Sequence, residues 1–127
     1  MFKIHGFLEQ ADLIEINETQ RMIKYLTMSS VFREILSEQG NLINIPKPFN
    51  SAKNLLTITN YKNYDLDKKF INKILETPQF KKNLLTDIKN NISNFEGICI
   101  DFENIDYKNL DSYIDLIKKI KYIIKLL

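Results

Sequence analysis

The feature that most constrains the fold of this 127-residue chain is the run Gly-Ile-Cys-Ile-Asp-Phe-Glu at residues 97 to 103. Successive side chains of a strand point to opposite faces. One face would be apolar (Ile98, Ile100, Phe102), and the other would carry Cys99, Asp101 and Glu103. Buried strands of parallel sheets are usually apolar on both faces, so two carboxylates indicate a strand whose end borders a cleft. The alternative is an exposed edge strand whose acids contact water.

The spacing of Asp101 and Glu103 favours acid–base chemistry. Two residues along a strand place the two Cβ atoms about 6 to 7 Å apart. At that distance one ionised carboxylate disfavours ionisation of the other, so Glu103 is expected to keep a proton near neutral pH. A protonated carboxylic acid beside an ionised one is what cleavage of a glycosidic bond requires of a general acid. The spacing does not by itself identify a sugar.

Residues 96 to 103, Glu-Gly-Ile-Cys-Ile-Asp-Phe-Glu, resemble the signature strand of the family 18 glycoside hydrolases, chitinase-like (β/α)8 barrels with the pattern Asp-Gly-x-Asp-x-Asp-x-Glu. Asp101 and Glu103 match the third Asp and the catalytic Glu, whereas Glu96 and Cys99 stand at the first and second Asp positions. The same residues also resemble the barrel of bacterial multidomain proteins that join it to a polysaccharide deacetylase and a glycosyltransferase, where a Cys-Ile-Asp-Phe-Glu version of the strand occurs. The stretches at 11–16 and 55–61 fit the same barrel.

The resemblance implies an α/β fold, and the length limits how much of it is present. A complete eight-stranded barrel takes about 250 residues and rarely fewer than about 200. We therefore expect residues 1–127 to form a single incomplete domain, about half of a (β/α)8 TIM barrel with parallel strands and outer helices. An open half-barrel has unpaired strand edges, so we expect association with a second copy or with a separately encoded half.

The resemblance also implies an activity, namely hydrolysis of N-acetylated amino-sugar polysaccharides or oligosaccharides. In this family the substrate's own acetamido oxygen is the nucleophile. Glu103 would protonate the leaving oxygen, Asp101 would orient the acetamido group, and Cys99 replaces an acid that normally tunes that Asp. The fragment alone is expected to be inactive, because later strands supply the rest of the site. The alternative is a non-catalytic remnant or pseudoenzyme that binds glycan or associates with another chain.

A second strand is predicted at Leu55 to Thr59, a β-rich run bounded by turn residues. Asn60 and Tyr61 follow it at the rim, where barrels of this kind keep their binding groups. Tyr61 is a candidate to stack on a sugar ring, with packing or simple exposure as the alternative. Asn60 is a candidate to hydrogen-bond a sugar hydroxyl, with turn formation as the alternative.

Periodicity and capping signals predict the remaining elements. We expect a short strand at Leu13–Ile16, a helix from Ser30 to Gln39 capped by Ser29 and Ser30, and loops at 41–54 and 62–67. Helices are expected at 66–75 and after Thr77-Pro78, which gives a strand–helix–strand crossover into the strand at 97–103. The last helix is expected from Tyr107 to about Leu126 with these residues facing inward: Leu110, Tyr113, Ile114, Ile117, Ile120 and Ile124.

Composition excludes several other function classes. Eighteen basic and sixteen acidic residues are spread along the chain for a net charge of +2, so nucleic acid is not an expected partner. The single cysteine excludes an internal disulfide, and no metal or cofactor motif is present, so we expect neither a metal nor a cofactor. No run is long enough for a membrane span or a signal peptide. We expect the chain as written in the cytoplasm, and at the envelope if it belongs to a larger protein.

Overall fold

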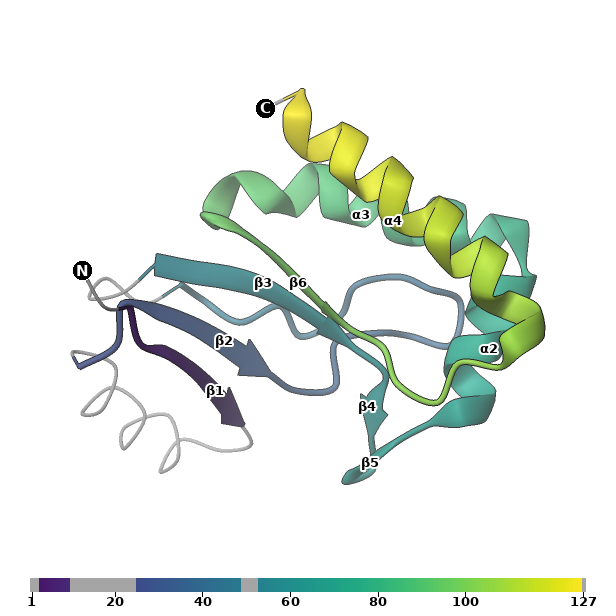
Figure 1. Ribbon diagram of the computed structural model, residues 1–127, viewed down its shortest axis with the longest axis horizontal. Helices are drawn as coiled ribbons and strands as arrows, with labels where there is room; N and C mark the ends of the chain where they lie inside the picture. The colour runs from purple at the N-terminus through teal and green to yellow at the C-terminus, as the bar shows by residue number, and fades with distance from the viewer. Residues whose placement is uncertain (1–2, 10–24, 49–52, 127) are drawn as a thin grey trace.

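A four-stranded parallel sheet forms the centre of the structure, a computed structural model that describes residues 3–9, 25–48 and 53–126. Its strands are β1 (His5–Glu9), β2 (Met28–Phe32), β3 (Lys53–Thr59) and β6 (Gly97–Asp101). They lie in the order β1-β2-β3-β6, and each neighbouring pair is parallel (Figure 1). The carboxyl ends of these four strands therefore meet at one edge.

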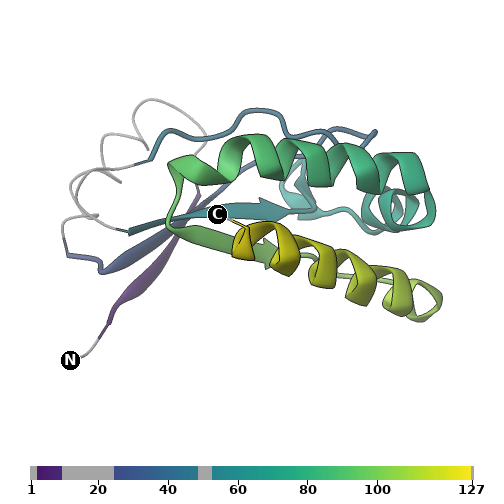
Figure 2. The ribbon, with the colours of Figure 1, turned by 90° about the horizontal axis from the view of Figure 1, so that it is seen from above.

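Helices connect and follow the last two strands. The crossover from β3 to β6 contains α2 (Lys68–Glu76), α3 (Pro78–Asn91) and a short 3-10 helix, η1 (Ile92–Asn94). A second 3-10 helix, η2 (Tyr107–Asn109), leads from β6 into α4 (Leu110–Lys125). These helices lie along one side of the sheet, and α3 and α4 run side by side, opposite in direction to the strands (Figures 1 and 2). No helix among the described residues is long and apolar enough to cross a membrane.

Local sequence signals explain where these helices begin. The Asp67 carboxylate accepts a hydrogen bond from the Phe70 backbone N–H at 2.9 Å, so it caps the first turn of α2. Pro78 occupies the first position of α3, where its missing N–H costs no hydrogen bond.

The hydrophobic core lies between the helices and the facing side of the sheet. It contains residues of β3 and one residue just after β6, residues of the helices, and two residues of the loop after β2: Leu56, Ile58 and Phe102; Phe70, Ile71, Ile74, Leu75, Leu84, Ile88, Ile92, Leu116 and Ile120; Ile35 and Leu36. Burial of apolar area on this scale is the main stabilising contribution.

The predicted fold class is confirmed, since the described residues form a parallel α/β sheet with helices on its outer side. The strands expected at 55–59 and 97–103 are present as β3 and β6, which pair in parallel through the expected helical crossover. However, β3 begins at Lys53, within the loop expected at 41–54, and β6 ends at Asp101, two residues before Glu103. The helices expected before and after Thr77 are α2 and α3.

The helix expected from Ser30 to Gln39 is wrong, because Met28 to Phe32 form strand β2. Ser29 and Ser30 are buried in the sheet rather than placed at a helix cap. The Ser29 hydroxyl donates to Asn54 Oδ1 at 3.1 Å. Pairing with β1 on one side and β3 on the other outweighs the local capping signal.

Three further expectations need correction or fall outside the description. Residues 62–67 are not a loop throughout, because β4 (Tyr61–Lys62) and β5 (Asp65–Leu66) pair as an antiparallel hairpin. In α4 the buried residues are Leu116 and Ile120, whereas Leu110, Ile114 and Ile124 are exposed. The apolar stripe of α4 is therefore wider than the surface that α2 and α3 cover. The strand expected at Leu13–Ile16 lies outside the described residues.

We predict that Ile58→Ala lowers the free energy of unfolding by about 2 to 5 kcal/mol, the usual cost of removing buried methyl and methylene groups from a packed core. Ile58 is fully buried in the sheet. Urea denaturation followed by circular dichroism measures the change. Ile114→Ala is the matched control, because Ile114 is 43% exposed and its truncation leaves almost no cavity. Equal losses in the two variants would contradict the assignment of the core.

Candidate active site

The side chains of β6 divide between the core and the opposite face of the sheet. Ile98, Ile100 and Phe102 pack with the core cluster beneath the helices. Cys99 lies on the other face, where it interacts with the hydroxyls of Ser30 from β2 and Thr57 from β3. The alternation predicted from the sequence is therefore present in the structure.

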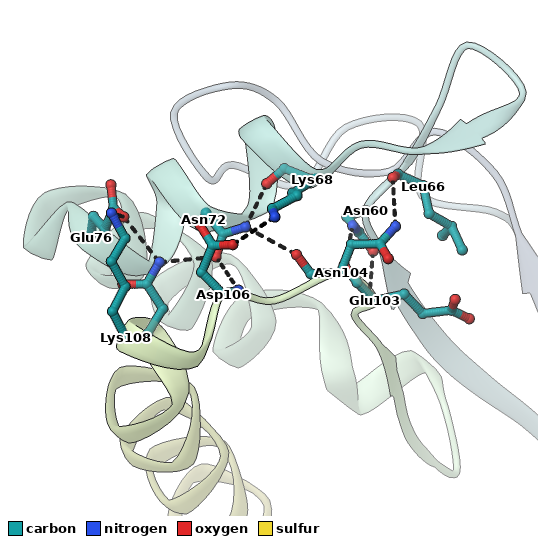
Figure 3. Close-up of polar contacts among 10 residues, drawn as sticks. Asn60, Leu66, Lys68, Asn72, Glu76, Glu103, Asn104, Asp106 and Lys108 are labelled. Carbon is teal, nitrogen blue, oxygen red and sulfur yellow. Dashed lines mark hydrogen bonds and ion pairs between the residues drawn. The ribbon is translucent and has the colours of Figure 1, made fainter.

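Asp101 and Glu103 follow one another at the carboxyl end of β6. Asp101 is the last residue of the strand and pairs with Thr59 of β3. Glu103 lies two positions further on, in the segment that leads to η2, and its side chain is exposed. In Figure 3 the Glu103 carboxylate points away from the cluster around Asn72, to the side on which the Leu66 side chain lies.

A cleft of about 360 Å³ opens at this edge of the sheet, within the range of small-molecule sites. Its walls come from all four strands of the sheet and from the β4–β5 hairpin: Phe7, Phe32, Thr59, Tyr61, Tyr64, Asp65, Leu66 and Asp101. Ligands of parallel α/β sheets bind outside the carboxyl ends of the strands. Asp101 therefore reaches a cavity in the place where the fold puts its ligands.

Aromatic side chains form most of the apolar wall. The rings of Phe32 and Tyr61 meet edge to face with centroids 5.6 Å apart, and Tyr61 meets Tyr64 in the same way at 6.5 Å. Tyr64 is 86% exposed and has a positive φ of 62°. Its neighbour Asn63 donates its backbone N–H to Glu34 Oε1 at 2.6 Å, which anchors the hairpin turn. The hairpin thus holds an exposed ring over the cleft in a backbone conformation that costs energy for tyrosine.

Asn60, predicted as a sugar contact, is fully buried directly after β3. Its Oδ1 accepts from the Glu103 backbone N–H at 3.0 Å, and its Nδ2 donates to the backbone carbonyls of Glu103 at 2.8 Å and Asp67 at 3.2 Å. Both N–H groups are in use and the side chain is fully buried, so a sugar hydroxyl does not reach this amide without a rearrangement. Tyr61, the other predicted contact, lines the cleft, and its stacking on sugar stays a prediction.

Burial raises the pKa of the Cys99 thiol, and the negative charge of Asp101 adds to that effect. Interactions with Ser30 and Thr57 favour the thiolate and act in the opposite direction. The thiol is therefore neutral at physiological pH, where the family pattern has an acid. Ser30 also hydrogen-bonds with His5 Nε2 at 2.7 Å, so a row of polar side chains crosses this face from β1 to β6.

Sequence reasoning did not name six residues of the cleft as site residues: Phe7, Phe32, Thr59, Tyr64, Asp65 and Leu66. Phe32 was assigned to a helix, and the β1 segment carried no predicted element. The run from Met28 to Phe32 does not alternate between apolar and polar residues, so its sequence gives no clear strand signal. Nor does a local signal identify Tyr64, whose place depends on the hairpin. Within the described part of the chain no three His, Cys, Asp or Glu side chains are grouped to bind a metal ion.

The fold and the position of the cleft define the class of structure, a parallel β/α arrangement that matches part of a barrel. The spore cortex-lytic enzyme SleL of Bacillus megaterium superposes with a TM-score of 0.78 at 20% identity, over 97% of this chain and 32% of that one. SleL of Bacillus cereus superposes with a TM-score of 0.76 at 18% identity, over 94% of this chain and 32% of that one. A chitinase from Bacteroides thetaiotaomicron superposes with a TM-score of 0.66 at 19% identity, over 94% of this chain and 42% of that one.

These solved structures share the fold, and the chain spans about a third of the length of the two SleL enzymes. No protein-family model matches the sequence. No curated protein matches it either.

We predict that alkylation of Cys99 by iodoacetamide has its inflection at a higher pH in the folded chain than in urea, because burial disfavours the thiolate. Ionisation of this thiol consequently lowers stability as the pH rises above the pKa of the unfolded chain. Cys99 is the only cysteine, so mass spectrometry reports on it alone. Ser30→Ala should move the inflection higher still. An inflection at or below that of the unfolded chain would contradict this account.

Proposed function

We propose that this chain supplies the acid pair and part of the substrate cleft of a glycoside hydrolase that acts on N-acetylated amino-sugar polymers. The observation that carries the proposal is the position of Asp101 at the carboxyl end of β6, in the wall of a cleft lined by aromatic rings. Aromatic faces bind the apolar faces of pyranose rings, and a carboxylate beside them can act on the sugar. Support also comes from the similar structures, which are a chitinase and two spore cortex-lytic enzymes.

The mechanism proposed is the one that the family resemblance implies, with the substrate's acetamido group as the nucleophile. The acetamido oxygen attacks the anomeric carbon while the bond to the leaving oxygen breaks, and Glu103 gives its proton to that oxygen. Asp101 orients the acetamido group and stabilises the positive charge that develops on it. Water then attacks the anomeric carbon and returns a proton to Glu103, so the configuration at that carbon is retained.

A second candidate function is favoured by the small part of the complete enzyme fold that this chain contains. The superposition on the Bacillus megaterium enzyme includes 97% of this chain but only 32% of that enzyme. Among the described strands β6 has one neighbour, β3, which leaves its other edge available for pairing. A glycan-binding or association module that never completes a hydrolytic site would have the same cleft without turnover.

We predict that Glu103→Gln lowers the hydrolysis of chitooligosaccharides by about 100-fold or more, the usual contribution of a general acid. Turnover is measured by chromatography of the products, with the chain alone and with the product of the neighbouring gene. Asp111→Asn, a charge change at an exposed position of α4, is the matched control and should leave the rate unchanged. Equal turnover by wild type and Glu103→Gln would remove Glu103 from the mechanism. Binding without turnover in either protein would favour the second candidate function.

We predict that Tyr64→Ala weakens binding of chitotriose by roughly threefold to tenfold, because it removes one ring of the cleft wall. The dissociation constant is measured by NMR titration of the labelled chain. Tyr122→Ala serves as the control, since Tyr122 is a 65% exposed tyrosine on α4. If the two variants bind equally well, the aromatic wall is not the sugar-binding surface.

A further inference from the structure

The side-chain amide of Asn60 continues the pairing of β3 with β6 beyond the last backbone pair. The parallel ladder ends where Thr59 pairs with Asp101. Past that point the Asn60 amide bonds both backbone groups of Glu103, accepting from its N–H at 3.0 Å and donating to its C=O at 2.8 Å. A side chain thus takes the place of the next backbone partner in the sheet.

Both N–H groups of the Asn60 amide are engaged within the protein. Its second N–H donates to the Asp67 carbonyl at 3.2 Å, and the Asp67 backbone N–H donates to the Asn60 carbonyl at 2.9 Å. A rotated amide would place its NH2 group against the Glu103 N–H, so only the observed orientation satisfies every group. The residue is fully buried, and loss of such an amide leaves buried backbone groups without partners.

The side chain of Glu103 makes no polar contact with a described residue that would fix its orientation. This side chain is exposed, and no hydrogen bond or ion pair joins its carboxylate to another described residue. The position of the Glu103 Cα atom and the direction of its Cα–Cβ bond, from which the carboxylate extends, depend on the backbone at residue 103, which the Asn60 amide holds from both sides.

The segment after Glu103 is held separately, by Asn72 of α2 (Figure 3). The Asn72 Nδ2 donates to the Asn104 carbonyl at 3.1 Å, and its Oδ1 accepts from the Asp106 backbone N–H at 2.8 Å. The Asn104 side chain in turn donates to the Leu66 carbonyl at 3.3 Å. Asn72 makes none of the bonds to Glu103, so the two buried asparagines anchor different parts of one loop.

We propose that Asn60 is a positioning residue, whose amide fixes the backbone of Glu103 so that the Glu103 carboxylate is presented to the sugar. This inference rests on the proposed function for its chemical meaning, and it replaces the role of Asn60 as a sugar ligand. Small displacements of a reacting group are costly, since a shift of about 1 Å can lower a rate by about 100-fold.

The test compares Asn60→Leu, which keeps the size of the side chain and removes its three bonds, with Asn72→Leu as the matched control. Amide hydrogen exchange by NMR should be about tenfold faster at Glu103 in Asn60→Leu, as expected for loss of one hydrogen bond. Asn72→Leu should accelerate exchange at Asp106 and leave Glu103 unchanged. Asn60→Asp, which keeps the acceptor for the Glu103 N–H, should change that amide less and provides a second variant if the leucine variant does not fold.

Kinetics on chitooligosaccharides give the functional readout. Asn60→Leu and Asn60→Asp should lower kcat at least about tenfold with KM within about twofold, whereas Asn72→Leu should leave both within about threefold. Unchanged kcat in folded Asn60 variants would overturn the proposal. If the wild type neither binds nor hydrolyses the sugar, the proposed function fails. Asn60 is then judged by exchange alone, and unaltered protection of the Glu103 amide in Asn60→Leu would overturn its positioning role.

Discussion

The parallel pairing of β6 with β3 determines the position of every group to which we assign chemistry. Side chains of Asn and Glu strengthen this pairing at both ends. At the start, the Glu96 backbone N–H donates to the Asn54 carbonyl at 2.9 Å, and Glu96 Oε2 accepts from the Asn54 N–H at 2.6 Å. At the end, Asn60 bonds the backbone of Glu103. A charge-assisted bond such as that of Glu96 is stronger than a neutral one, which suits a strand that has only one described neighbour.

The pairing also explains how the two faces of β6 can lie in different environments, one apolar and one polar. The apolar side chains of β6 are held against the helices, where burial stabilises the fold. The opposite face is polar, with Ser30, Thr57 and Thr59 buried beside the strand. Among the described residues every buried side-chain polar atom has a hydrogen-bond partner, so this polar face does not carry the cost of unsatisfied groups. The cleft can therefore be lined by reactive side chains without weakening the sheet below it.

Sequence reasoning identified β3, β6 and the helices between them because their local patterns agree with their tertiary places. It failed at β2, where Ser29 and Ser30 resemble a helix cap and Val31, Ile35 and Leu36 recur at helical spacing. What decides that segment is pairing with β1, 23 residues earlier, and with β3, 25 residues later, as in the bond between Ser29 and Asn54. Local propensity carries no information about such partners.

The residues of the candidate site fall into two groups. The place of Asp101 and Cys99 on one face follows from the period of two of strand β6 and could be predicted locally, whereas Glu103 lies beyond the end of that strand. Tyr64 and Phe7 could not be predicted in this way, since each reaches the cleft through a hairpin or a strand that only the folded chain defines. The burial of Asn60 likewise depends on a contact across 43 residues. The residues that shape the cleft can therefore be identified only from the tertiary structure, whereas residues that share one face of a single strand can be identified from the sequence.

The neutral thiol at Cys99 bears on how the proposed reaction would be divided among the remaining groups. An acid at this position would add a negative charge next to Asp101, and the hydroxyls of Ser30 and Thr57 lie close enough to stabilise it. With a thiol whose pKa burial raises, that charge is absent at neutral pH. Under the proposed mechanism, Asp101 alone would then stabilise the positive charge that develops on the acetamido group. Correct placement of Glu103 by Asn60 matters more in such a site, because less electrostatic stabilisation is available to compensate for a misplaced acid.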